Sequence, residues 1–388
     1  MSRSHASVPS LWVALAMAMA VLVSGFGPTP ALAQDAPPDS VGPPQVHADG
    51  QVTFRFVAPE ASAVLIMLEG AAPSPLSQED SGIWSTTVGP LPPDLYTYYY
   101  LVDGSPAGDP ANPLQKPVIT GGAEGIVHVP GPDSLIWELS DVPRGALSEH
   151  AYESQVIGEE RRLWVYTPPG YDAGADRDYP VLYLLHGVMD DERAWTTAGR
   201  AQVILDNLSA REQVEPMLVV MPLGYGFANP RERAMELLGP ADHLALMDTF
   251  AQSLLTEIVP LVEAAYPVRT DAGSRAIAGL SMGGTQALYI GLEHPDRFSW
   301  IGTMSGAFIM FVGEFEAWFS TLDGASRDAV RLVWMSVGTQ DFLRGINQEI
   351  SESLTSNGLP VSYDETPGGH AWGVWRRALA RLTPLLFR

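Results

Sequence analysis

The chain of 388 residues contains no cysteine, and its 22 basic residues include a single lysine, Lys116. The absence of cysteine excludes disulfides, thiolate nucleophiles and zinc–thiolate sites. Positive charge is also scarce, since 45 acidic residues give the chain a formal net charge of −23. Such a chain is a poor partner for nucleic acid, because phosphate binding needs clustered Lys and Arg. It also repels anionic membrane surfaces and polyanions at long range.

Signatures of metal and phosphate sites are missing as well. The chain has no H-E-x-x-H and no acidic EF-hand loop, and its one lysine follows no Gly-rich phosphate loop. We therefore expect neither a metal nor a cofactor. What is present is apolar: hydrophobic residues make up 46% of the chain and charged residues 17%. This composition supplies a sizeable core, in a length that suits two or three domains.

Residues 1–33 have the three parts of a secretory signal peptide. Arg3 gives a positive start, Leu11–Val23 is an uncharged apolar run, and Ala31-Leu32-Ala33 fits the small-x-small rule for cleavage. The alternative is a membrane anchor, but the run is shorter than the roughly 20 residues that a spanning helix needs. We expect cleavage after Ala33, a periplasmic or secreted mature chain, and no later membrane span.

Residues 34–44 are rich in proline, which is typical of an extended linker, and short strands follow over residues 45–131. Such strands, separated by Gly and Pro and without a helical period, indicate a small β-sandwich. The strand candidates are "QVTFRFVAP", "SAVLIML", "GIWSTTV" and "LYTYYYLVDG". On "VTFRFVAPEASAV", "GIWSTTVGPLPPDLYTYYYLVDG" and "GDPANP" the region resembles the immunoglobulin-like early-set domains, which are related to glycogen-binding modules.

Residues 142–388 instead alternate strands with helices. This alternation predicts an α/β fold with a mostly parallel sheet and helices on both of its faces. The strand candidates are "RRLWVYTPP", "YPVLYLLHG", "MLVVMP", "SRAIAG", "FSWIGTMSG", "RLVWMSVG" and "VSYDETPGG". The helix candidates are residues 198–210, 244–266, 283–294, 343–357 and 372–386.

Ser281 stands in "GLSMG", between a strand candidate and a helix candidate. The pattern G-x-S-x-G in this position predicts a nucleophile elbow, a strained turn that lifts the serine hydroxyl above the sheet. The residues two before and two after the serine must be small, and Gly279 and Gly283 meet this need. The N–H of Met282 then lies at a helix N-terminus, where negative charge is stabilised.

A serine nucleophile needs a base, and two histidines follow Ser281 in the chain. His294 ends the helix that Ser281 begins, so a helix C-terminal position explains it. His370 lies in the Gly-rich loop "TPGGHAW" after the last strand candidate, where the base of such a fold belongs. We predict His370 as the base.

The acid of the triad should follow the penultimate strand, and Asp341 does so in "RLVWMSVGTQD". It would orient His370 and stabilise the imidazolium. Three competitors are better interpreted as solvated surface charges: Asp323 and Asp328 precede that strand, and Asp364 lies within the last one. We predict Asp341 as the acid.

An oxyanion hole needs two N–H donors. We predict the backbone of Met282 as one and the backbone of Val188 as the other, because Val188 follows a strand that ends in His186-Gly187. The glycine lets the backbone approach a substrate closely. His186 itself is expected to shape the loop; a catalytic role is the lesser alternative.

Five segments together resemble the esterase-D-like superfamily of α/β-hydrolases: "YPVLYLLHGVMDDERAW", "RTDAGSRAIAGLSMGGTQAL", "FSWIGTMSGAF", "VGTQDFL" and "GGHAWGVW". The superfamily includes the feruloyl and acetylxylan esterases of carbohydrate esterase family one, trilactone siderophore esterases and mycolyltransferases. The resemblance implies a Ser281–Asp341–His370 triad and oxyanion donors at Val188 and Met282. One departure is Met189-Asp190-Asp191, where relatives often carry glycines; it leaves the shape of the acyl pocket open.

The expected activity is that of a secreted serine esterase on a small-molecule or polysaccharide-linked ester, feruloyl or acetyl groups on carbohydrate being favoured. One alternative is a trilactone siderophore esterase, which the negative charge disfavours because ferric catecholates are anionic. Another is an inactive carbohydrate-binding relative, which the complete triad disfavours.

Aromatic residues in the expected loops at the carboxyl edge of the sheet are candidates for substrate contact, since aromatic rings stack on aromatic acyl groups and sugars. They are Trp195, Tyr225, Phe227, Phe308 and Trp372. The alternative for each is packing in the core or rim.

In the first domain, alternation puts Tyr96, Tyr98 and Tyr100 on one strand face and Tyr99 on the other. Stacked tyrosines suit sugar rings, so this domain is expected to position the enzyme on a polymer or to shape the rim of the site. The alternative is that the tyrosines pack against the catalytic domain.

Overall fold

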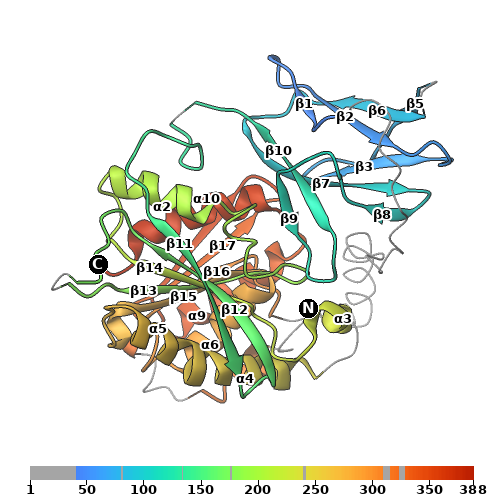
Figure 1. Cartoon of the computed structure of the whole chain (residues 1–388). Helices are drawn as coiled ribbons and strands as arrows, with labels where there is room; N and C mark the ends of the chain where they lie inside the picture. The colour runs from blue at the N-terminus through green and yellow to red at the C-terminus, as the bar shows by residue number, and fades with distance from the viewer. Residues whose placement is uncertain are drawn as a thin grey trace.

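The computed structural model describes residues 41–79, 82–132, 134–174, 177–238, 242–308, 315–322 and 328–388 (Figure 1). The expected signal peptide and residues 34–40 of the expected linker lie outside these residues. Two small β-sheets come first along the chain, and one large sheet with helices on both faces follows. Figure 1 shows the small sheets, in blue and cyan, beside one end of the larger unit.

The two small sheets are antiparallel and share one core. The first has the order β1 (Gln45–Val46), β2 (Val52–Val57), β6 (Ile83–Val88), β5 (Ser77–Gln78). The second has the order β4 (Ser74–Pro75), β3 (Val64–Leu68), β7 (Asp94–Val102), β10 (Ala123–Val129), β9 (Gln115–Pro117), with β8 (Ser105–Ala107) paired to β7. Side chains of both sheets meet in a single hydrophobic cluster, as a β-sandwich requires. We call this unit the β-domain.

The tyrosines of β7 do not form an exposed stack. Tyr98 and Tyr100 are buried in the shared core, where the Tyr98 ring packs edge-on against Phe54 at 4.9 Å between centroids. Tyr96 packs against the same core, and its hydroxyl donates to the Pro92 carbonyl at 2.7 Å. Neither interpretation holds for Tyr98 and Tyr100, whose rings fill the β-domain itself, while Tyr96 is half-buried at the edge of that core.

The large sheet has eight strands in the order β11-β12-β14-β13-β15-β16-β17-β18. Neighbours from β14 to β18 are parallel, while β11 and β12 are antiparallel additions at one edge. This confirms the expected α/β fold with a mostly parallel sheet. The strands are β11 (Ala146–Ser154), β12 (Glu159–Thr167), β13 (Val181–Leu185), β14 (Leu218–Pro222), β15 (Arg275–Leu280), β16 (Trp300–Met304), β17 (Leu332–Gly338) and β18 (Val361–Thr366).

Helices cover both faces because alternate residues of each central strand point to opposite sides. Side chains of α2 (Ala201–Ala210) and α10 (Trp372–Leu382) share one core with Leu182 and Leu184. The other core, with Tyr183 and Leu185, receives side chains from α4 (His243–Ser253), η2 (Leu254–Ile258), α5 (Val259–Ala265), α6 (Met282–Glu293) and α9 (Arg344–Ser356). The remaining helical elements are α3 (Pro230–Arg233), η1 (Ala234–Leu238), η3 (Ala272–Ser274), α8 (Phe315–Phe319) and η5 (Thr383–Leu385).

The helical run His243–Ala265 is long and apolar enough to cross a membrane, contrary to the expectation that no later stretch would be. Its apolar side is occupied, however. Met247, Phe250, Leu254 and Ile258 are all buried in the core on the α6 side of the large sheet. The run is therefore a core helix, whose hydropathy reflects packing between the sheet and its neighbours.

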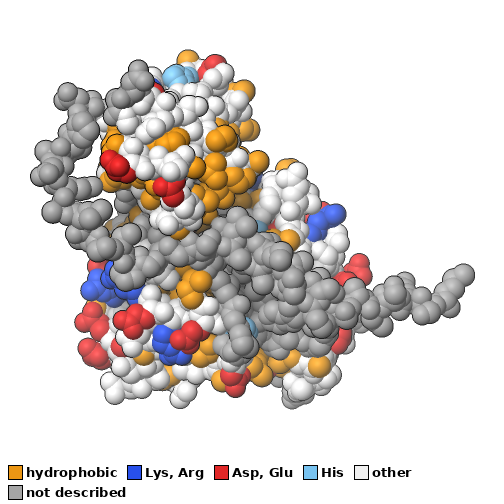
Figure 2. Space-filling model, turned by 90° about the vertical axis from the view of Figure 1, so that its right-hand side faces the viewer, with side chains coloured by type: hydrophobic (Ala, Val, Ile, Leu, Met, Phe, Trp, Pro, Cys, Tyr) orange, Lys and Arg blue, Asp and Glu red, His pale blue; other side chains and the backbone are white. Residues whose placement is uncertain are grey.

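The β-domain sits on the large unit through charged side chains. Asp94 of β7 accepts from Arg376 at 2.7 Å and from Arg377 at 2.6 Å, both on α10. Glu69, just after β3, accepts from the N–H of Gly373 at 2.9 Å. Figure 2 shows hydrophobic side chains gathered over the upper, β-rich part of the drawn face, while most of the basic side chains visible there lie lower.

Candidate active site

Ser281 lies on a strained turn between β15 and α6. Its φ of 51° and ψ of −115° fall in a region that residues with a side chain rarely adopt. The turn is crowded: a Cβ on Gly283 would lie 2.5 Å from the His186 carbonyl oxygen, and one on Gly279 would collide with the Gly283 carbonyl. The two glycines therefore have the steric role that the G-x-S-x-G pattern predicts.

Three side chains from distant parts of the chain meet at this turn. His370, in the loop after β18, places Nε2 3.0 Å from the Ser281 hydroxyl and Nδ1 3.0 Å from an Asp341 carboxylate oxygen. Asp341 follows β17 and has no exposed side-chain surface. The His370 ring packs between Phe342 and Trp375, with centroids 5.0 and 4.9 Å away. Packing and hydrogen bonds together fix its orientation.

The charge of Asp341 decides which nitrogen of His370 carries the proton. Burial by itself raises the pKa of Asp341, but His370 and the Leu343 N–H, which donates at 2.9 Å, bring the pKa below its ordinary value. The group is then an ionised carboxylate, which can only accept. Nδ1 of His370 must donate to it, and Nε2 is left to accept from the Ser281 hydroxyl. This is the arrangement in which His370 can take a proton from Ser281.

The competitors lie elsewhere. Asp364 lies on the edge strand β18 and pairs with Arg381 at 2.5 Å. His294 closes α6, the position that the sequence assigned to it. Asp328 is exposed, and Asp323 lies outside the described residues.

The loop after β13, Gly187–Asp191, passes directly beside Ser281. Val188 and Met189 line the pocket there, and Met189 has a φ of 69°. His186 supports the loop: its Nδ1 lies 2.8 Å from the Gly187 carbonyl, and its Nε2 accepts from the Gly224 N–H at 2.9 Å. Both ring nitrogens are thus bound to backbone, as expected for a residue that shapes the loop. The Met282 N–H is in the first turn of α6, where helix geometry leaves N–H groups without an intrahelical acceptor.

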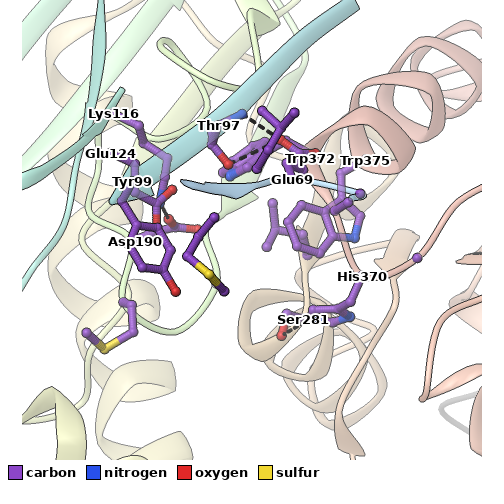
Figure 3. Close-up of a pocket in the computed structure, with 18 of the residues that line it drawn as sticks. Glu69, Thr97, Tyr99, Lys116, Glu124, Asp190, Ser281, His370, Trp372 and Trp375 are labelled. Carbon is purple, nitrogen blue, oxygen red and sulfur yellow. Dashed lines mark hydrogen bonds and ion pairs between the residues drawn. The ribbon is translucent and has the colours of Figure 1, made fainter. Parts of the chain in front are cut away.

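A pocket of about 340 Å³ opens over Ser281 and His370. It has two walls. One comes from the large unit and includes Val188, Met189, Leu280, Trp372 and Trp375; the other comes from the β-domain and includes Met67, Glu69, Thr97, Tyr99, Lys116 and Glu124. Figure 3 shows Lys116, Glu124 and Asp190 together on one side of the pocket, and Ser281 with His370 on the other.

Of the five aromatic candidates for substrate contact, Trp372 lines this pocket. The other four do not, and that prediction was wrong for them. Trp195 is buried and donates its indole N–H to the Leu185 carbonyl at 3.0 Å, while the Tyr225 hydroxyl donates to the Asp190 carbonyl at 3.0 Å. Phe227 and Phe308 are buried in the core on the α6 side. The alternative of core packing holds for these four residues, since their rings complete the layers beneath the loops.

A wall from the β-domain agrees with the expectation that the first domain shapes the rim of the site, but sequence reasoning named none of the residues that line it apart from Tyr99. The sequence contained one indication of this wall. Lys116 is the single lysine of a chain with net charge −23, so many carboxylates are available to pair with it in the interior. The structure pairs Lys116 with Asp190 and Glu124 at 2.6 and 3.3 Å. Within the described residues, no group of three or more His, Asp or Glu side chains is placed to hold a metal.

Fold and site geometry are those of the α/β-hydrolase class. A family model described as putative esterase matches residues 154–386, more than half of the chain, and the chain therefore belongs to that family.

Individual relatives agree with this assignment. The chain is 29% identical over 353 residues to an endo-1,4-beta-xylanase/feruloyl esterase of Xylanibacter ruminicola, covering 89% of this chain and 46% of the relative. It is 25% identical over 257 residues to an iron(III) enterobactin esterase of Escherichia coli, covering 63% and 58%. A solved ferulic acid esterase is 27% identical, with a TM-score of 0.54 over 62% of this chain and 97% of that one. The chain spans about half the length of these two curated relatives.

Proposed function

We propose that this chain is a serine carboxylic-ester hydrolase that removes feruloyl or acetyl groups from carbohydrate. The observation that carries the proposal is the pair of 3.0 Å contacts that link Ser281, His370 and Asp341 at the floor of the pocket. Similarity to a feruloyl esterase supports the acyl class. We further propose that the chain is exported, on the strength of its first 33 residues.

Acylation would begin with the Ser281 oxygen attacking the ester carbonyl carbon while its proton moves to Nε2 of His370. The carbonyl oxygen becomes an oxyanion, and the N–H groups of Val188 and Met282 are the donors proposed to stabilise it. Asp341 stabilises the imidazolium without taking the proton. Collapse of the tetrahedral species breaks the bond to the alcohol oxygen, which leaves with the His370 proton.

Deacylation repeats the same chemistry with water. His370, now neutral, takes a proton from the water as its oxygen attacks the acyl carbon, and returns a proton to Ser281 as the acid leaves. Each oxyanion donor is worth roughly 3–4 kcal/mol of transition-state stabilisation in enzymes of this kind.

An uncharged aromatic acyl group suits the pocket better than a ferric catecholate. Met67, Met189, Leu280 and Trp375 supply apolar lining, and sulfur and aromatic groups both pack well on a ring. The carboxyl groups of Glu69 and Glu124 also line the pocket, and carboxylates disfavour an anionic substrate.

Two measurements test the proposal. Ser281→Ala should lower turnover of an activated aryl ester by about 10⁴-fold or more while thermal unfolding stays unchanged. A fluorophosphonate should label Ser281 in the wild type and nothing in the variant. Wild-type turnover in Ser281→Ala would refute the assignment.

The substrate class is tested by comparing kcat/KM for an aryl acetate, methyl ferulate, acetylated xylan and enterobactin. We expect methyl ferulate or acetylated xylan to lead. A clear preference for enterobactin would establish the siderophore esterase alternative instead.

A further inference from the structure

The loop that carries the Val188 N–H is held from outside its own domain. Lys116 of β9 places Nζ 2.6 Å from the Asp190 carboxylate, and only 5% and 7% of the two side chains are exposed. Three residues further along, the N–H of Ile119 donates to the Met189 carbonyl at 2.9 Å. Both contacts join the β-domain to consecutive residues of this loop, at the pocket.

The loop needs such support because its conformation is not one that its own residues favour. Met189 has a φ of 69°, in the left-handed region that residues with a side chain seldom occupy. Within the large unit, the Tyr225 hydroxyl bonds the Asp190 carbonyl at 3.0 Å, and the Asp190 N–H donates to the Gly187 carbonyl at 3.3 Å. Neither of these contacts holds the Asp190 side chain, which Lys116 does.

A second carboxylate, that of Glu124, helps to keep Lys116 charged in its pair with Asp190. Lys116 faces Glu124 across the β9–β10 ladder, and Glu124 takes a second bond from the ammonium at 3.3 Å. Burial by itself lowers the pKa of Lys116, but the Asp190 and Glu124 carboxylates outweigh it and hold the pKa above its ordinary value. The lysine therefore stays charged over the whole neutral range, where it attracts the Asp190 carboxylate.

We propose that Lys116 is a positioning residue for ester hydrolysis: through Asp190 it fixes the loop that presents the Val188 N–H to the oxyanion. The inference rests on the proposed function, because it assigns Val188 to the oxyanion hole. It makes the β-domain part of the catalytic apparatus without giving it a reacting group. Figure 3 shows the arrangement, with the lysine and Asp190 opposite Ser281 across the pocket.

The test uses the full chain with two variants, Lys116→Met and Lys116→Met/Asp190→Asn. The double variant leaves no unpaired charge at position 190, and Glu124 reaches water with 19% of its side chain exposed, so this variant still gives a result if the single variant fails to fold. We expect kcat for a soluble aryl ester to fall about 10–100-fold in both, with KM within about threefold of wild type, because a misplaced donor weakens the transition state more than the bound ester. The rate of Ser281 phosphonylation, which also builds an oxyanion, should fall in parallel.

Arg275→Met is the matched control. Arg275 is as buried as Lys116 and pairs with Glu263, but it stands at the end of β15 remote from Ser281. This variant should lower the melting temperature and leave kcat of the folded protein within about twofold of wild type. A role in stability alone would make the Lys116 variants behave in the same way.

Unchanged kcat in the folded double variant, with Ser281→Ala inactive, would overturn this proposal and leave the proposed function standing. Full turnover in Ser281→Ala would overturn both.

Discussion

The two walls of the pocket come from different parts of the chain and are built in different ways. On the large unit, Ser281, Asp341 and His370 follow β15, β17 and β18, so one edge of a parallel sheet brings them together. On the β-domain, Glu69 and Lys116 reach the pocket from the antiparallel second sheet. The first wall presents the Ser281 hydroxyl and the His370 imidazole to the substrate. The charged groups of the second wall instead bond to residues of the first.

The comparison teaches that lining a pocket and acting in it are separate properties. The polar atoms of Glu69 are occupied by Thr97 and by the N–H of Gly373, and those of Lys116 by Asp190 and Glu124. In each case one partner lies in the β-domain and one in the large unit, so these groups are already occupied by protein contacts. Changes in the first wall should therefore affect chemistry, and changes in the second should affect placement and stability.

The largest effect is expected from Asp341→Asn, which should lower kcat by about 10⁴-fold because an amide favours the wrong imidazole tautomer of His370. Steady-state kinetics on an aryl ester measures it. Asp364→Asn is the control, since Asp364 pairs with Arg381 on the rim, and its kcat should stay within about twofold of wild type. If the two variants exchanged behaviours, the acid would have been assigned one strand too early.

Asp94→Ala should act on the contact between domains instead. It leaves the guanidinium of Arg376, with 1% of its side chain exposed, without its carboxylate, and breaking a buried pair costs about 3–5 kcal/mol. Denaturant unfolding of the full chain measures this loss. The kcat of the folded variant should change less than tenfold, because Asp94 does not line the pocket.

Arg162→Ala is the matched control for that variant. Its partners Glu149 and Glu160 are exposed, so we expect a loss below about 1 kcal/mol. If Asp94→Ala abolished turnover without lowering stability, the distinction between the two walls would fail.

A smaller effect follows from comparing Asp190 with Glu192, two residues away. The β-domain supplies a cation to Asp190, whereas burial, with Asp191 adding to it, raises the pKa of Glu192 to about 7. Between the ordinary value near 4.5 and about 7, the folded chain keeps a proton that the unfolded chain has lost. Stability therefore falls as pH rises through this window, by up to about 3 kcal/mol, and levels off above it.

Glu192→Gln stays neutral and should remove this fall. The free energies of unfolding at pH 5 and pH 8 give the difference for each protein, and wild type should lose more than the variant. Equal losses would show that Glu192 is solvated in the folded chain.

The features of the fold and site that could be predicted from the sequence are those determined by neighbouring residues in the chain. The G-x-S-x-G pattern and the rule that functional residues follow parallel strands were enough to predict that Ser281, Asp341 and His370 meet. Both the pattern and the rule need only one strand and the loop after it. The edge strand β11 was missed, since it pairs only with β12 and its residues up to Glu153 are partly or fully exposed, without an apolar run. The strand β10 was also missed, because it contains Gly125 and stands next to residues typical of turns.

The errors have a different cause. Residue type does not distinguish a ring on a loop surface from a ring beneath it, so Trp195 and Phe308 were expected at the pocket and lie in the core. The pair between Lys116 and Asp190 spans 74 residues and two domains. Its existence depends on how the two units dock, which no pattern within either unit encodes.

The bonds between Asp94 and α10 also bear on how the chain is made. Asp94 and Arg376 are separated by 282 positions, and a ribosome adds about 5–20 residues per second. The β-domain therefore emerges about 15–60 s before the partner of its buried carboxylate exists. During that interval the Asp94 carboxylate must stay hydrated, because neither Arg376 nor Arg377 has been made. Both arginines lie on α10, so a truncation just before α10 removes that cover of the large sheet and leaves Asp94 of the β-domain without these two partners.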